Sequence, residues 1–186
     1  MVQARLLTNS GQDWRWSIDA FRYFEFFKAP LYPVFLAIFT FLPEGQAQWW
    51  AASSQSVLAT VAVFAVFVMT QRLHSTRAAL IAAAATALYF RNVVIQPMFM
   101  QERIYLPLLV TALAVLSLAV TGRGRPRQFG LAGALLGLAA LARSMPVYFV
   151  GPAALAWWVM KRDRRAAVQA GALLVGFGVT TLPYCL

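Results

Sequence analysis

The sequence predicts an all-α protein: a polytopic bundle of about six transmembrane helices, with a short juxtamembrane helix on the outer side. Composition is the first reason for this prediction. Of the 186 residues, 61% are hydrophobic and 12% are charged, and the mean hydropathy is +0.65. Soluble domains carry about a quarter charged residues. A soluble fold of this length could not remove so much apolar surface from water, so the bilayer is the expected solvent.

Long apolar stretches are the second reason. A helix needs about 20 apolar residues to cross a bilayer, with a range of roughly 17–25. Six stretches reach or approach this length, at residues 49–70, 78–95, 104–121, 128–142, 147–160 and 166–183. The first of them opens with Trp49 and Trp50, which suit the interface between lipid and water. We therefore expect residues 49–186 to form the transmembrane bundle.

The placement of basic residues is the third reason, and it also predicts orientation. Loops 71–77, 122–127 and 161–165 together hold nine Lys or Arg residues and one acidic residue, Asp163. They follow the first, third and fifth stretches, so they share one side, which the positive-inside rule assigns to the cytoplasm. These loops carry most of the formal net charge of +10, so we do not expect nucleic acid as a partner.

Residues 1–48 are expected to form an outer loop. Within them, residues 30–42 are apolar but too short to cross the membrane, and Pro30 and Pro43 bound them. We expect a short helix along the membrane surface here. Aromatic and charged residues alternate just before it, as suits the lipid headgroup layer, although a loop packed on the outer face fits the pattern equally well.

Small residues recur where helices are expected to touch. Gly130, Gly133 and Gly137 lie on roughly one helix face, and the last two form a GxxxG pair. Packing within the chain is favoured over a dimer interface.

Ionisable residues near the ends of the spans are the candidates for chemistry, because charges at membrane depth are costly and usually functional. Glu102 begins the third span and could act as a functional carboxylate or simply pair with Arg103 at the surface. Arg143 and Arg91, on the same outer side, could each bind phosphate with a planar fork of donors or extend to lipid headgroups. His74 and Cys185 are the only histidine and cysteine, so the sequence predicts no metal-ligand cluster.

Three motifs carry a resemblance to a known family. They are KAPLYPVFLA at residues 28–37, QERIYL at 101–106 and GALLGLAALARSMP at 133–146. In this order they resemble the signatures of the GT-C membrane glycosyltransferases, specifically the bacterial relatives of protein O-mannosyltransferases and the aminoarabinose transferases.

The resemblance implies an enzyme of the plasma (inner) membrane. Such enzymes move a sugar from a polyprenyl-phosphate-linked donor to a glycan, lipid or protein acceptor on the extracytoplasmic face. Glu102 falls at the family's second-loop carboxylate, which assists catalysis or holds a divalent metal; metal dependence stays open. We assign Arg143 to the carrier phosphate. The remaining substrate-binding candidates are Arg103, Arg91, Lys28 and Tyr32.

The family's first-loop catalytic acid has no clear counterpart. The segment at Ala4–Leu7 resembles the end of the helix that follows this acid, so we expect the acid and the first span upstream of Met1. Asp13 and Asp19 are the substitutes that the chain itself offers. Family members also continue beyond the position of Leu186, so we expect a chain truncated at both ends. Two alternatives remain: a transporter or flippase segment for a lipid-linked anion, and a non-catalytic membrane assembly subunit.

Overall fold

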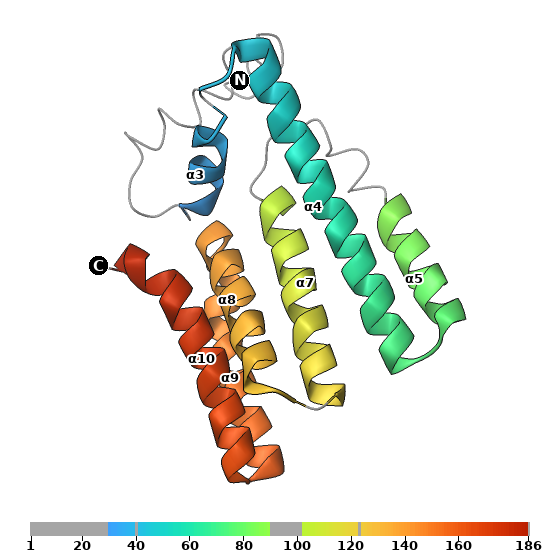
Figure 1. Ribbon diagram of the computed structural model, residues 1–186, viewed down its shortest axis with the longest axis vertical. Coiled ribbons are helices and arrows are strands. Elements are labelled where there is room, and N and C mark those ends of the chain that lie inside the picture. Colours follow the sequence, from blue (N-terminus) through green and yellow to red (C-terminus); the bar gives the residue numbers. More distant parts are fainter. Residues whose placement is uncertain (1–29, 40, 90–101, 123, 186) are drawn as a thin grey trace, which may run out of the picture.

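The computed structural model describes residues 30–39, 41–89, 102–122 and 124–185 (Figure 1). Within these residues the structure has seven helices and no strand, which confirms the predicted all-α class. The helices are α3 (Leu31–Ala37), α4 (Glu44–Leu73), α5 (Thr76–Leu88), α7 (Glu102–Thr121), α8 (Pro126–Ala142), α9 (Met145–Lys161) and α10 (Arg164–Cys185).

Each of the six apolar stretches coincides with a helix, but two predicted helices are too long. The helix predicted over 30–42 ends at Ala37. Beyond it, Phe39 N donates to Leu36 O at 3.0 Å and Leu42 N to Phe39 O at 3.1 Å, so the chain continues as tight turns. Pro43 disfavours the helical conformation only at the preceding residue, Leu42, so the earlier end at Ala37 follows from these turns.

The second correction concerns the stretch predicted over 78–95. Its helix, α5, ends at Leu88, and Tyr89 has an extended ψ of 116°. The alanines of this segment are strong helix formers, whereas the aromatic residue that follows loses side-chain freedom in a helix. Residues 90–95 lie outside the described residues. One helix is longer than its predicted stretch: α4 starts at Glu44 rather than at residue 49. A helix can continue into polar residues, which the apolar stretch leaves out.

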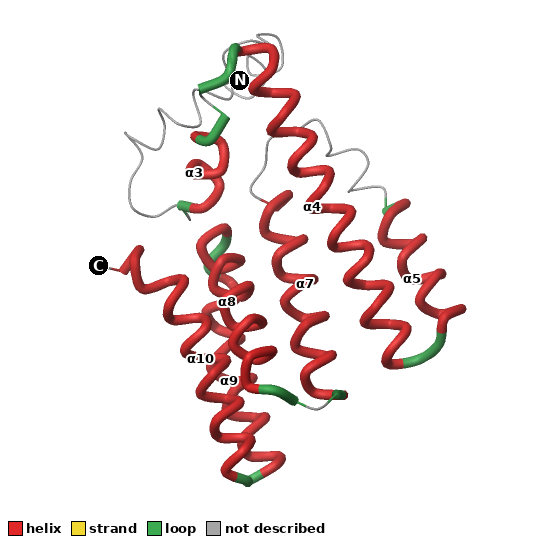
Figure 2. Tube along the Cα trace, viewed as in Figure 1, coloured by secondary structure: helices red, strands yellow, loops and turns green. Residues whose placement is uncertain are grey.

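The helices run up and down beside one another (Figure 1). The loops joining α4 to α5, α7 to α8 and α9 to α10 all lie at one end of the molecule, the lower end in Figures 1 and 2. These are the three basic loops, and we call this end the basic end. The short helix α3 and the start of α7 lie at the opposite end, which we call the α3 end.

Three helices are long and apolar enough to cross a membrane by length and composition, over Gln46–Leu73, Glu102–Thr121 and Arg164–Tyr184. Helices α8 and α9 have 17 residues each, at the lower limit of roughly 17 for a span. The chain is thus a helical membrane protein.

The glycine face of α8 packs against α10. A Cβ atom at Gly133 would overlap the carbonyl oxygen of Leu173, and one at Gly176 would overlap the carbonyl oxygen of Gly130. Close approach of two helix backbones is the usual role of small residues in membrane helices. These glycines therefore allow two helices of the same chain to pack closely, and packing within the chain is what the sequence favoured over a dimer interface.

Candidate functional site

An ion pair joins the start of α7 to the end of α8 at the α3 end. Glu102 is the first residue of α7, and Arg143 directly follows the last residue of α8. Since the two helices are antiparallel neighbours, these two positions meet although they are 41 residues apart in sequence. Arg143 Nη1 donates to Glu102 Oε1 at 3.2 Å. Glu102 thus pairs with Arg143, an arrangement that the sequence analysis did not consider.

The pair is partly shielded from solvent and positioned by its neighbours. The Arg143 side chain is 39% exposed and that of Glu102 is 25% exposed. The guanidinium carbon of Arg143 lies 5.9 Å from the ring centroid of Tyr105, one turn into α7. A cation over an aromatic face gains about 0.5–1 kcal/mol at exposed sites. Arg143 thus has two partners that orient its donors, while enough of its surface is open to meet a ligand.

Tyr32, on α3, also lies at this site. Its side chain is buried and packs in a small apolar cluster with Leu36, Ala51 and Ile104. Burial raises the pKa of the Tyr32 phenol well above its ordinary value of 10.0, and the Glu102 charge adds to the rise. The side-chain amide of Gln55 and the positive charge of Arg103 act in the opposite direction. Tyr32 is therefore within electrostatic reach of both charged residues that begin α7.

Two buried polar atoms of this site lack a hydrogen-bond partner among the described residues. They are the Tyr32 hydroxyl and Gln55 Nε2, whose side chain is 2% exposed. The two groups are near neighbours, since the Gln55 side chain lowers the pKa of the Tyr32 phenol. Buried polar groups are nearly always paired, and an unpaired one costs about 1–3 kcal/mol. Both groups are thus available to a polar ligand at this site.

The structure brings together four of the eight residues singled out from the sequence: Tyr32, Glu102, Arg103 and Arg143. The other four, Asp13, Asp19, Lys28 and Arg91, lie outside the described residues. Sequence reasoning missed Gln55 and Tyr105. Gln55 carried a usable signal, since it is a polar side chain inside the apolar run of α4. Tyr105 belongs to the second motif but had no role assigned.

The described ranges contain no group of three or more His, Cys, Asp or Glu side chains that could hold a metal ion. At this site Glu102 could supply one carboxylate ligand to a hard cation such as Mg²⁺, which prefers oxygen ligands. The described residues thus offer at most one carboxylate ligand at this site.

The fold and the site together define a class: a helical membrane protein with a carboxylate, arginines and a buried phenol at the end opposite its basic loops. Residues 27–184 match the family described as dolichyl-phosphate-mannose-protein mannosyltransferase, and the chain belongs to this family of GT-C membrane glycosyltransferases. The match covers all three sequence motifs, so the resemblance is confirmed. Neither the comparison with curated proteins nor that with solved structures gave a match.

Proposed function

We propose that the chain takes part in sugar transfer from a polyprenyl-phosphate-linked donor to a glycan, lipid or protein acceptor at the extracytoplasmic face of the plasma membrane. The observation that carries this proposal is the ion pair between Glu102 and Arg143, 3.2 Å apart, at the end opposite the basic loops. Glu102 belongs to the second family motif and Arg143 to the third. Tyr32, from the first motif, lies within electrostatic reach of Glu102.

Each residue has a distinct proposed role. Arg143 binds the phosphate of the carrier, because a guanidinium presents paired donors to phosphate oxygens. Glu102 holds Arg143 in place and either accepts the proton of the acceptor hydroxyl or ligates a divalent metal. Tyr32 and Gln55 offer the polar atoms that a sugar hydroxyl can satisfy. Arg103, Arg91 and Lys28 remain candidates for substrate contacts, and Asp13 and Asp19 for the first-loop acid.

The transporter alternative predicts helices broken near the middle of the membrane, with polar groups gathered there. Helices α4, α7 and α10 are each continuous over 30, 20 and 22 residues. The ion pair lies at a helix end instead. This arrangement favours a reaction at the membrane surface over a transport path.

The test is transfer of a radiolabelled sugar from a lipid-linked donor in membranes that contain the full chain. Glu102→Gln keeps the size of the side chain but removes the base and the charge. We expect the transfer rate to fall about a hundredfold or more, as is usual for loss of a general base. Glu44→Gln, which neutralises a carboxylate at the start of α4, is the matched control and is expected to keep the rate.

Two further outcomes decide between the alternatives. Unchanged transfer by Glu102→Gln would remove Glu102 from the mechanism, and no binding of the carrier lipid by the unaltered chain would favour the assembly role. Repeating the assay with a chelator separates the two roles of Glu102, because a general base still works without metal whereas a metal ligand does not.

A further inference from the structure

A polar pocket opens at the basic end, between the ends of α7, α9 and α10. It has a volume of about 210 Å³, and the side chains that line it include Lys161, Arg165 and Gln169. Asp163 also lines it, so two cations face one carboxylate. The Asp163 carboxylate is engaged in the fold, because its Oδ1 accepts a 2.5 Å hydrogen bond from Ala166 N at the start of α10. The pocket is therefore net positive.

The walls of this pocket are held by one buried amide. Gln169 is 4% exposed; its Nε2 donates to the carbonyl oxygen of Gly124, and its Oε1 accepts from Trp157 Nε1 at 2.8 Å. Lys161 Nζ in turn lies 5.6 Å from the centroid of the Trp157 ring. The amide thus ties the α7–α8 loop to α9 and α10, so the pocket is a preformed feature rather than a gap between mobile loops.

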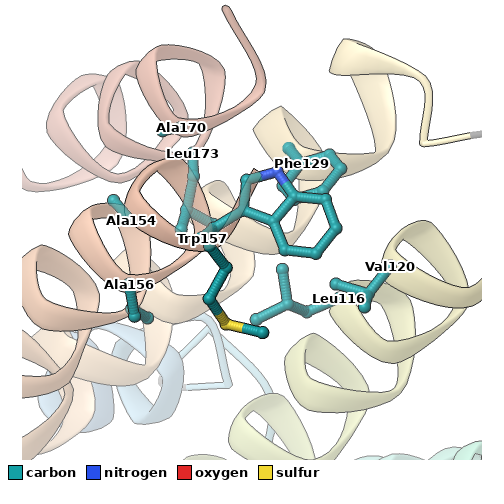
Figure 3. A pocket seen from close by; sticks show the side chains of 10 residues that line it. Leu116, Val120, Phe129, Ala154, Ala156, Trp157, Ala170 and Leu173 are labelled. Carbon is teal, nitrogen blue, oxygen red and sulfur yellow. The ribbon is translucent and has the colours of Figure 1, made fainter. Parts of the chain in front are cut away.

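An apolar pocket adjoins the polar one on the side of the membrane interior. Its volume is about 170 Å³, and its lining includes Leu116, Phe129, Ala156 and Leu173 (Figure 3). Val120 and Trp157 line both pockets. Phe129 and Trp157 pack with their ring centroids 5.5 Å apart and their planes tilted by 39°, and they form one apolar wall. The two pockets therefore make one composite groove, cationic at the membrane surface and apolar further in.

We propose that this groove binds one anionic phospholipid, with its phosphate at Lys161 and Arg165 and an acyl chain against Phe129 and Trp157. The polar and apolar parts follow each other in the order in which a phospholipid presents its headgroup and chains. Basic pockets between transmembrane helices on the cytoplasmic side are typical sites for anionic headgroups. The bilayer supplies this ligand at high concentration, and the net positive charge selects it over zwitterionic lipids. The site is independent of the proposed sugar transfer, which belongs to the α3 end.

The headgroup part is tested by native mass spectrometry of the full chain in detergent, titrated with dioleoyl phosphatidylglycerol or dioleoyl phosphatidylcholine. We expect phosphatidylglycerol to bind more tightly. The double variant Lys161→Gln/Arg165→Gln is expected to weaken its binding about tenfold or more, because it removes the two basic residues that contact the phosphate near the membrane surface. Binding of phosphatidylcholine should stay the same.

The matched control is Arg72→Gln/Arg77→Gln, which removes the same charge from the same end of the molecule. Neither arginine lines the pocket, so this variant is expected to retain the lipid preference. Equal loss in the two double variants would overturn the proposal, because it would show diffuse attraction by the whole basic end. Unchanged binding in both would overturn it as well.

The acyl-chain part is tested with Ala156→Phe, which fills the apolar groove from an exposed position on α9. This variant should bind dioleoyl phosphatidylglycerol several-fold more weakly, while binding of the dihexanoyl lipid, whose chains are too short to fill the groove, stays unchanged. Equal effects on the two lipids would contradict an acyl chain in the groove. Helix content by circular dichroism, compared across all variants, confirms that each one folds.

Discussion

At the scale of single residues, the candidate site combines a charged pair with two unsatisfied buried polar groups. The pair between Glu102 and Arg143 is too exposed to contribute much to stability, since ion pairs open to solvent contribute about 0.2–1 kcal/mol. The Tyr32 hydroxyl and the Gln55 amide nitrogen have no hydrogen-bond partner among the described residues, and a buried polar group without one costs about 1–3 kcal/mol. We propose that the charged pair and these two polar groups serve to bind a ligand rather than to stabilise the fold.

Replacement of Tyr32 separates a role of its hydroxyl in stability from a role in ligand binding. Tyr32→Phe removes the orphan hydroxyl and keeps the ring that packs with Leu36 and Ile104. We expect the free energy of unfolding to stay equal or to rise by about 1 kcal/mol, while sugar transfer falls. Unfolding in mixed micelles with increasing denaturing detergent measures the first quantity. A clear loss of stability would contradict the proposed role in binding, because it would mean that the hydroxyl has a partner within the chain.

Tyr32 also predicts a dependence on pH. The folded protein holds the phenol proton to a higher pH than the unfolded chain, whose ordinary pKa is 10.0. Below that pH both states keep the proton, so this group causes no change. Above it only the unfolded state releases the proton, so the free energy of unfolding falls as pH rises. Measured at about pH 9 and pH 11, this fall should be smaller for Tyr32→Phe than for the unaltered chain. Equal falls would show that Tyr32 titrates normally.

At the scale of elements, the contact between α8 and α10 depends on glycine. Gly133→Ala places a methyl group against the backbone of Leu173. We expect it to lower the free energy of unfolding by about 1–3 kcal/mol, the usual cost of overpacking. Backbone cannot yield as a flexible side chain would, so the helices must separate.

Gly171→Ala is the matched control on α10. A Cβ atom there meets nothing within 4 Å, and alanine favours the helix over glycine by about 0.5–1 kcal/mol. This variant should therefore be neutral or slightly stabilising in the same unfolding measurement. If both glycine variants were equally destabilised, tight packing between α8 and α10 would not explain the effect.

Apolar length and proline positions were enough to predict where most helices lie, because a helix must satisfy its own backbone in the bilayer. The ends of α3 and α5 were less predictable, since they depend on turns within apolar sequence rather than on a change in polarity. For the site, sequence reasoning selected Glu102 and Arg143 one by one. Their pairing depends on which helices are neighbours, and that information is not local. Gln55 was missed although it is a polar residue in an apolar run, because its proximity to Tyr32 depends on how α3 lies beside α4.

At the scale of the whole molecule, the three basic loops share one end and the candidate site lies at the other. We propose a multi-pass chain with the basic end in the cytoplasm, as the positive-inside rule requires. In a Cys185→Ser background, Ser144→Cys reports on the α3 end and His74→Cys on the basic end; both positions are exposed. A membrane-impermeant maleimide should label the first in intact cells and the second only after lysis. The reverse pattern would invert the proposed orientation.

The most direct test of the proposed function is to find where a lipid-linked donor binds. A photoactivatable polyprenyl phosphate can be crosslinked to the full chain in membranes, and the labelled peptides can then be identified by mass spectrometry. We expect label on the peptides that contain Glu102 and Arg143, with a marked decrease in Arg143→Gln. Label confined to the basic end, or unaffected by Arg143→Gln, would contradict a donor site at the Glu102–Arg143 pair.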